Sequence, residues 1–170
     1  MSGSAPRQSW NLAATLLRSV PVGIAVFAAV LLATALIDAG ATSDGNGGEL
    51  LLSEMSLSRL VFDVLFLSVL VAPVLETLIF SVTGWALLRG FNILWSLGFS
   101  CAVAVLAWWF HGADPAALNR ALGFFLLAFW YRKIAREAGT TLAFVGTAGA
   151  HAIWNLTSVS LWFVGQIITH

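Results

Sequence analysis

The sequence predicts an all-α, polytopic transmembrane helix bundle with about five spans. Of its 170 residues, 59% are hydrophobic and only 9% are charged, and the mean hydropathy is +0.91. These values are far from the averages of soluble domains. One membrane crossing takes about 20 apolar residues, so the chain has room for about five crossings and short loops. We therefore expect a single bundle, residues 19–170, that lies in the lipid bilayer as a multi-pass protein of the cell (plasma) membrane.

The first predicted span covers residues 19–37 and follows a polar head, residues 1–18. An arginine-bearing flank followed by an apolar stretch and small residues is also typical of a cleaved signal peptide. The apolar stretch, however, is longer than the roughly 7 to 15 residues of a signal-peptide core. We therefore expect a retained anchor, with a cleaved signal as the alternative.

An acidic external loop is expected at about residues 38–56. It is rich in Gly, Ser, Thr and Asp and carries Asp38, Asp44, Glu49 and Glu54. This composition is typical of a solvated, flexible connection between spans.

The second span, residues 60–88, is longer than one straight crossing requires. Pro73 removes a backbone hydrogen bond within it, so we expect the helix to kink or restart just before Glu76. The third span covers residues 93–110 and ends at His111.

The fourth span is expected to begin after Asp114, a residue type that caps helices, with Pro115 at the first helical position. It runs to about Arg136, and Gly139 provides the stop. A threonine then caps the fifth span, residues 141–169.

Charge predicts the orientation of the bundle. If the five spans alternate in direction, most of the basic residues share one side of the membrane and the acidic loop lies on the other. By the positive-inside rule, the N-terminus is then cytoplasmic and the C-terminus external. The basic residues on the cytoplasmic side are Arg7, Arg18, Arg89, Arg132, Lys133 and Arg136.

Two classes of site are disfavoured by composition. The net charge is zero, whereas a nucleic-acid partner requires clustered Lys and Arg. The single cysteine, Cys101, allows neither a disulfide framework nor a CxxC metal site. We expect it to be a buried structural thiol.

Four polar residues interrupt the apolar spans: Glu76, His111, His151 and Asn155. An ionisable group at the centre of a membrane helix costs about 2.5 to 3.5 kcal/mol, so such groups tend to face an interior site. His151 and Asn155 are four residues apart and therefore share one helix face. The sequence predicts that the four side chains converge on one polar pocket.

Each of these residues also has a structural interpretation. His111 could be a histidine of the membrane interface. Glu76 could form an ion pair with Arg59 or Arg120, and His151 with Asn155 could be interhelical hydrogen-bond partners.

The motifs resemble those of a known family. The segment Ala72-Pro73-Val74-Leu75-Glu76, then His111, then His151-x-x-x-Asn155 resembles the CPBP family, also called ABI, of CAAX-type prenyl endopeptidases and bacteriocin-processing enzymes. The resemblance covers residues 71–156. Three positions depart from the family pattern: Thr77 stands in place of a second Glu, Ser81 in place of an Arg, and Ala107 in place of a Phe.

The resemblance implies an intramembrane endopeptidase that hydrolyses a peptide bond of a small membrane-associated protein or peptide. It implies catalytic roles for Glu76 as the general base, His111 as its partner, and His151 with Asn155 as oxyanion donors. It implies no obligatory cofactor. Zinc is the alternative, since one Glu and two His form a plausible ligand set, but the chain has no His-Glu-x-x-His helix.

Two other functions stay open. Thr77, Ser81 and Ala107 favour a catalytically silent relative that serves as a scaffold, assembly factor or small subunit of a complex with other membrane proteins. A proton or small-solute pathway through Glu76 and the histidines is the third alternative, disfavoured by the lack of an inverted repeat.

The expected depth of His111 in the membrane argues against a pocket shared with Glu76. At about 1.5 Å per residue, Glu76 lies roughly 20 Å and His111 roughly 33 Å from Arg89, which precedes the third span. The two side chains meet only if residues 91–95 lie outside the membrane or the helices tilt.

Overall fold

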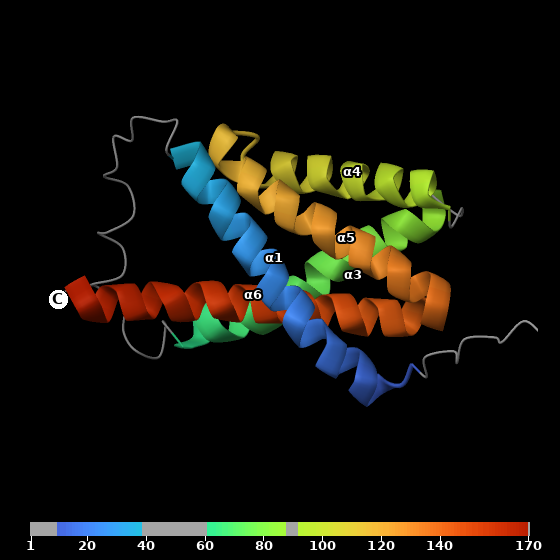
Figure 1. Ribbon diagram of the computed structural model, residues 1–170, viewed down its shortest axis with the longest axis horizontal. Coiled ribbons are helices and arrows are strands. Elements are labelled where there is room, and N and C mark those ends of the chain that lie inside the picture. Colours follow the sequence, from blue (N-terminus) through green and yellow to red (C-terminus); the bar gives the residue numbers. More distant parts are fainter. Residues whose placement is uncertain (1–9, 39–60, 88–91, 170) are drawn as a thin grey trace, which may run out of the picture.

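The structure is a computed structural model that describes residues 10–38, 61–87 and 92–169. Throughout these ranges the regular elements are helices (Figure 1), so the all-α prediction is confirmed. The elements are α1 (Leu12–Asp38), the π-helix η1 (Val61–Val71), α3 (Ala72–Leu87), α4 (Ile93–Phe110), the 3₁₀-helix η2 (Pro115–Ala117), α5 (Leu118–Ala138) and α6 (Thr140–Thr169).

The predicted boundaries hold with one shift. The helix of the first span begins at Leu12 instead of residue 19, because the Asn11 side chain caps it by accepting a hydrogen bond of 2.8 Å from the Ala14 amide. Part of the expected head is therefore helical. Gly139 ends α5 with a φ of +91°, as a glycine stop does. The acidic loop after Asp38 lies outside the described residues.

Pro73 lies at the point where the second span changes its helical type. The π-helix η1 ends at Val71 and the regular helix α3 starts at Ala72. Proline fits the first turn of an α-helix, where the missing amide hydrogen has no intrahelical partner. The restart places Glu76 in the second turn of α3.

Three helices form the most closely packed part of the molecule. Figure 1 shows α1 crossing α6, with α5 beside both, and successive helices running in opposite directions. At the α1–α6 crossing, a Cβ on Gly23 would lie 2.5 Å from the Ala150 carbonyl oxygen, so only glycine allows this approach. Nearby, the Ser19 hydroxyl donates a 2.7 Å hydrogen bond to the Gly146 carbonyl.

A tight turn joins α4 to α5. Asp114 caps η2 by accepting a 2.7 Å hydrogen bond from the Ala117 amide, as predicted. The Trp108 indole donates to the Asp114 carbonyl at 2.8 Å and holds the turn against α4. His111 is the residue at which α4 ends, so this turn fixes its position.

Two helices are long and apolar enough to cross a membrane, at Leu12–Ala35 and Ile93–Phe110. A shorter apolar stretch covers Phe66–Ile79. These helices are compatible with a membrane protein; five crossings and their orientation stay predictions. Cys101 is exposed on α4, so the prediction of a buried thiol is wrong: the residue lies on the helix face turned away from α5.

Candidate functional site

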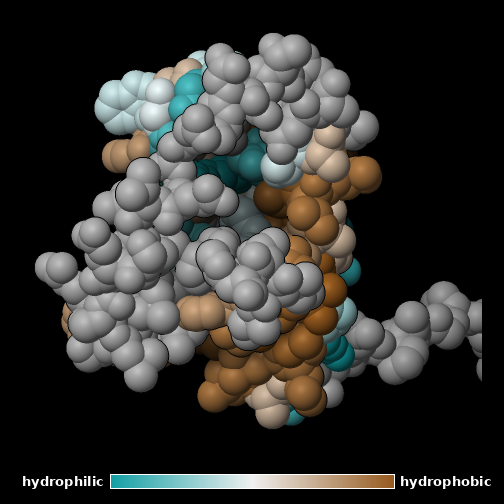
Figure 2. All heavy atoms as spheres, turned by 90° about the vertical axis from the view of Figure 1, so that its left-hand side faces the viewer, coloured by the Kyte–Doolittle hydropathy of each residue, from teal (hydrophilic) through white to brown (hydrophobic). Residues whose placement is uncertain are grey.

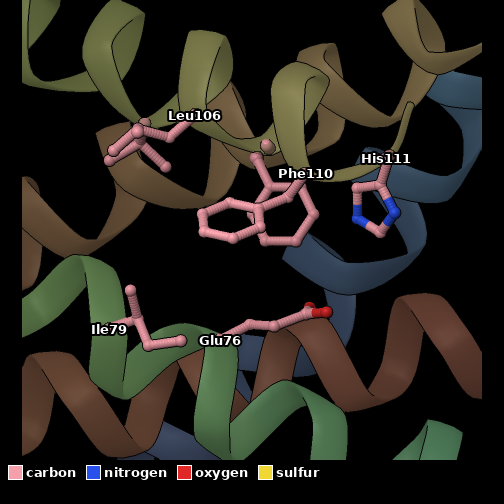
Figure 3. Close-up of a pocket in the computed structure, with 8 residues that line it drawn as sticks. Glu76, Ile79, Leu106, Phe110 and His111 are labelled. Carbon is pink, nitrogen blue, oxygen red and sulfur yellow. The ribbon is translucent and has the colours of Figure 1, made fainter. Parts of the chain in front are cut away.

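A cavity of about 290 Å³ lies between α3, α4 and α5. Its wall is mainly apolar, with Ile79 from α3, Phe110 from α4 and Phe124 from α5 among the lining residues. Glu76 and His111 are the polar side chains that line it, and Figure 3 shows them pointing toward one another across the cavity. A mainly apolar cavity with a few convergent polar groups is the usual form of a small binding or catalytic site.

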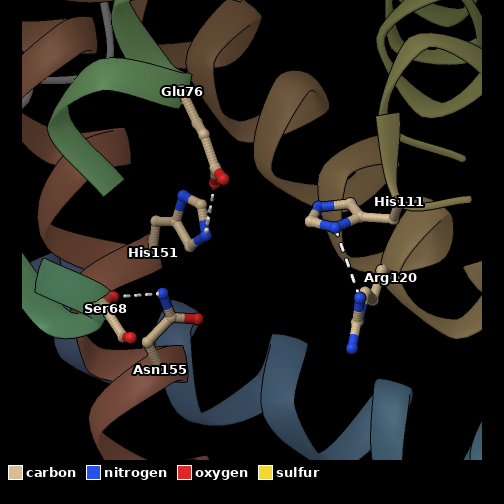
Figure 4. A network of polar contacts seen from close by, with 6 residues as sticks. All are labelled: Ser68, Glu76, His111, Arg120, His151 and Asn155. Atoms are coloured by element: carbon tan, nitrogen blue, oxygen red, sulfur yellow. Dashed lines mark hydrogen bonds and ion pairs between the residues drawn. The ribbon is translucent and has the colours of Figure 1, made fainter. Parts of the chain in front are cut away.

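Glu76 is held by a histidine from another helix. The His151 Nε2 atom lies 3.4 Å from a Glu76 carboxylate oxygen (Figure 4). His151 is only 2% exposed, whereas Glu76 is 34% exposed. For this contact to be a hydrogen bond, Nε2 must carry the hydrogen and donate it to the carboxylate. The buried Nδ1 atom of His151 has no hydrogen-bond partner, so the ring is anchored through Glu76 and through packing.

Aromatic rings fix the His151 ring in place. It stacks on Trp154 with centroids 5.2 Å apart and meets the edge of Phe124 at 5.1 Å. Trp154 in turn packs against Gly123, where an added Cβ would lie 2.4 Å from the indole ring. Gly123 is therefore a site-supporting residue that the sequence did not indicate, because only the contact between α5 and α6 shows it.

His111 is oriented by Arg120, a residue that the sequence offered as a partner of Glu76 and not of His111. The Arg120 Nη1 atom lies 3.3 Å from His111 Nδ1 (Figure 4). A guanidinium has donors only, so Nδ1 must accept and the hydrogen of the neutral ring must lie on Nε2. Figure 4 shows this second ring nitrogen facing Glu76. Burial, and then the positive charge of Arg120, lower the pKa of His111 below its ordinary 6.5.

The structure shows Glu76 beside a histidine, where an ion pair with Arg59 or Arg120 was one of the interpretations. In the part of the chain that the structure describes, the ion-pair distance recorded for Glu76 is to His151, and Arg120 contacts His111 instead. Arg59 lies outside the described residues. The turn between α4 and α5 explains the contact, because it brings the start of α5 beside the end of α4.

Asn155 contacts a different element. Its amide nitrogen donates a 2.7 Å hydrogen bond to the Ser68 carbonyl in η1 (Figure 4), and Asn155 is not among the residues that line the cavity. This bond joins α6 to η1 and uses one of the two amide hydrogens. The oxyanion role of Asn155 stays a prediction.

The three positions that depart from the family pattern are all buried. Ala107 lines the cavity. The Thr77 and Ser81 hydroxyls have no hydrogen-bond partner, so they do not hold the Glu76 carboxylate. Among the described residues, no group of three His, Cys, Asp or Glu side chains is arranged to hold a metal ion.

The depth difficulty of His111 is resolved by the packing. The Phe124 ring contacts both histidines, with its centroid 5.9 Å from His111 and 5.1 Å from His151. The second turn of α3 and the end of α4 therefore meet at one cavity, which Glu76 and His111 both line. Figure 2 shows the molecule from the left-hand side of Figure 1: among the described residues, hydrophobic ones cover a broad continuous area, and hydrophilic ones lie beside it.

Comparisons with known proteins add no relative. No family model, no curated protein and no solved structure matches this chain. The resemblance to the CPBP family therefore depends on the motif residues of the sequence alone.

Proposed function

We propose that the protein is an intramembrane endopeptidase of the CPBP type, in which a water activated by Glu76 cleaves a small membrane-associated protein or peptide. One observation carries the proposal: Glu76 and His111 face each other across a single cavity, and His151 contacts the same carboxylate. Ionisable groups in apolar helices are costly, so their convergence on one cavity favours a catalytic or binding role.

The chemistry needs a base, a water and a donor for the developing negative charge. The Glu76 carboxylate takes a proton from a water in the cavity, and the resulting hydroxide attacks the peptide carbonyl carbon. The carbonyl oxygen becomes an oxyanion. Collapse of this intermediate breaks the C–N bond, and the proton held by Glu76 passes to the leaving nitrogen. No cofactor takes part in these steps.

The contacts favour a division of roles that differs from the one the resemblance implies. His151 contacts the Glu76 carboxylate through Nε2 and is enclosed by aromatic rings, which suits a residue that orients the base. His111 presents its Nε2 hydrogen to the cavity, which suits the donor to the oxyanion. Arg120 keeps that tautomer by donating to Nδ1. In this scheme His151 takes over the support that the missing Glu and Arg give in the family.

The proposed placement has five crossings, a cytoplasmic N-terminus and an external C-terminus. Its support is the alternating direction of the helices and the position of the basic residues: Arg18 and Lys133 pack on the neighbouring rings of Trp10 and Trp130, and Arg136 lies in the last turn of α5. In this placement the α4–α5 turn, and with it the mouth of the site, lies on the external side.

The second candidate is a silent relative that acts as a scaffold or small subunit. Thr77 and Ser81 favour it, because their buried hydroxyls lack hydrogen-bond partners where the family has an ion pair. In that case the Glu76 to His151 contact only joins α3 to α6.

Comparative proteomics of membrane-associated peptides tests the proposal. Cells with the native chain are compared with cells that carry Glu76→Gln, a substitution that keeps the shape of the side chain and removes the base. We expect a cleaved peptide to disappear and its precursor to accumulate, at unchanged abundance of the protein. Cys101→Ser, at an exposed position on α4 that lines neither the cavity nor any other proposed site, is the control and should process normally. Equal peptide profiles for Glu76→Gln and the native chain would exclude hydrolysis and favour the scaffold.

A further inference from the structure

The geometry points to a second site: a groove between the start of α4 and the end of α5 that binds the phosphate of an anionic phospholipid headgroup. The groove encloses about 240 Å³. Arg132, Lys133 and Arg136 from α5 line it together with Ser96 from α4, and Ile93 and Phe129 form its apolar wall. We call it the basic groove. It lies at the opposite end of α4 from His111, so it is separate from the proposed catalytic cavity.

The charges of the basic groove suit one phosphate. Three cations face one carboxylate, Glu137, which is exposed and also lines the groove. The net charge of the lining is therefore positive. Arginine binds phosphate oxygens with two parallel hydrogen bonds, and lysine adds a point charge.

One of the three cations is held in place before any ligand binds. Arg132 is only 5% exposed, and its guanidinium carbon lies 5.7 Å from the centre of the Phe99 ring. A buried, packed guanidinium loses little side-chain freedom on binding. Lys133 and Arg136 are exposed and can close over a phosphate from the open side.

Neighbouring aromatic residues place the basic groove at headgroup depth. The Trp10 and Trp130 rings lie 6.3 Å apart, with Lys133 5.4 Å from the Trp130 ring and Arg18 4.4 Å from the Trp10 ring. Tryptophans and cations gather in this way where a helix passes from acyl chains to headgroups. The exposed apolar residues Ile93 and Leu94 at the start of α4 suit the acyl chains of the same lipid. This is why we assign a lipid phosphate in preference to a free one.

The inference uses the membrane placement of the proposed function but not the hydrolysis. A basic pocket between helices on the cytoplasmic side, where anionic lipids are concentrated, would hold this end of α4 and α5 at a fixed depth. The hydrolytic site could fail its own test while the lipid site remained.

Native mass spectrometry of the full chain in neutral detergent tests the assignment. The protein is mixed with phosphatidylglycerol or with phosphatidylcholine of the same acyl chains, and the fraction that retains lipid is measured. We expect selective retention of phosphatidylglycerol, and roughly 30-fold weaker retention in Lys133→Gln/Arg136→Gln, since each cation near an anionic lipid gives about a factor of five. Arg18→Gln removes a charge at the same end but outside the groove, so it should stay within about two-fold of the native chain. Glu76→Gln should retain the lipid fully.

Three results would overturn the assignment. Equal retention of the two lipids would show that the phosphate charge is not recognised. Equal losses in Arg18→Gln and in the double variant would show diffuse attraction instead of a site. Displacement of the lipid by inorganic phosphate would assign the groove to a free anion. Circular dichroism melting of each variant checks that a lost signal is not caused by unfolding.

Discussion

The two histidines of the site occupy opposite environments. His151 lies in the middle of α6 and is enclosed by Phe124 and Trp154, whereas His111 ends α4 at a turn and is only half-buried. Packing fixes the first ring, and a hydrogen bond from Arg120 fixes the second. The comparison suggests that an enclosed histidine can orient a carboxylate and that only the histidine on the rim can meet water and substrate.

The largest expected effect separates these two roles directly. His111→Ala should lower processing by roughly 10²- to 10³-fold, the usual loss for one oxyanion donor, while the unfolding temperature changes little because the side chain lies at a helix end. His151→Ala should lower processing and also cost at least about 2 kcal/mol of stability, because it empties a packed site. The test measures the processing rate and the unfolding temperature of both variants under the same conditions. If both variants destabilise the protein equally, the contrast between an enclosed and a rim histidine is incorrect.

A smaller effect is expected from the packing behind His151. Gly123→Ala would place a Cβ within 2.4 to 2.8 Å of the Trp154 ring, and overpacking of this kind costs about 1 to 3 kcal/mol. Because Trp154 supports His151, processing should fall as well.

Gly98→Ala is the matched control for this change. It adds the same methyl group where nothing lies within 4 Å, and a helical Gly→Ala change typically adds about 0.5 to 1 kcal/mol of stability. The unfolding temperatures of Gly123→Ala and Gly98→Ala, measured in detergent, are compared with that of the native chain. A neutral result for Gly123→Ala would mean that the Trp154 ring moves aside freely and does not fix His151.

The smallest effect concerns the rim histidine alone. Burial and the Arg120 charge lower the pKa of His111, so the ring should stay neutral at a more acidic pH than an exposed histidine does. Arg120→Gln removes a positive charge that disfavours imidazolium, so the pKa should rise toward the ordinary value, and burial should keep it from rising further. Carbon-13 NMR of labelled histidine follows this titration. If the pKa of His111 is unchanged or lower in Arg120→Gln, Arg120 does not act on His111 as proposed.

The sequence predicted each helix for local reasons. Pro73, Asp114 and Gly139 act on their own backbone neighbours, so the restart, the cap and the stop could be read without knowledge of the packing. The start of α1 was placed too late, because an asparagine cap can begin a helix before its apolar stretch does.

The sequence by itself determined that the chain is helical, where its helices break, and which ionisable side chains interrupt its apolar stretches, because these depend on composition and on residues close along the chain. Tertiary structure alone decided which of those side chains meet. Phe124 contacts two histidines that are 40 positions apart, Arg120 contacts His111, and Asn155 contacts Ser68. Such contacts depend on crossing angles and on the room that Gly23 and Gly123 leave for neighbouring helices, and neither quantity is encoded in the spacing of residues along one helix.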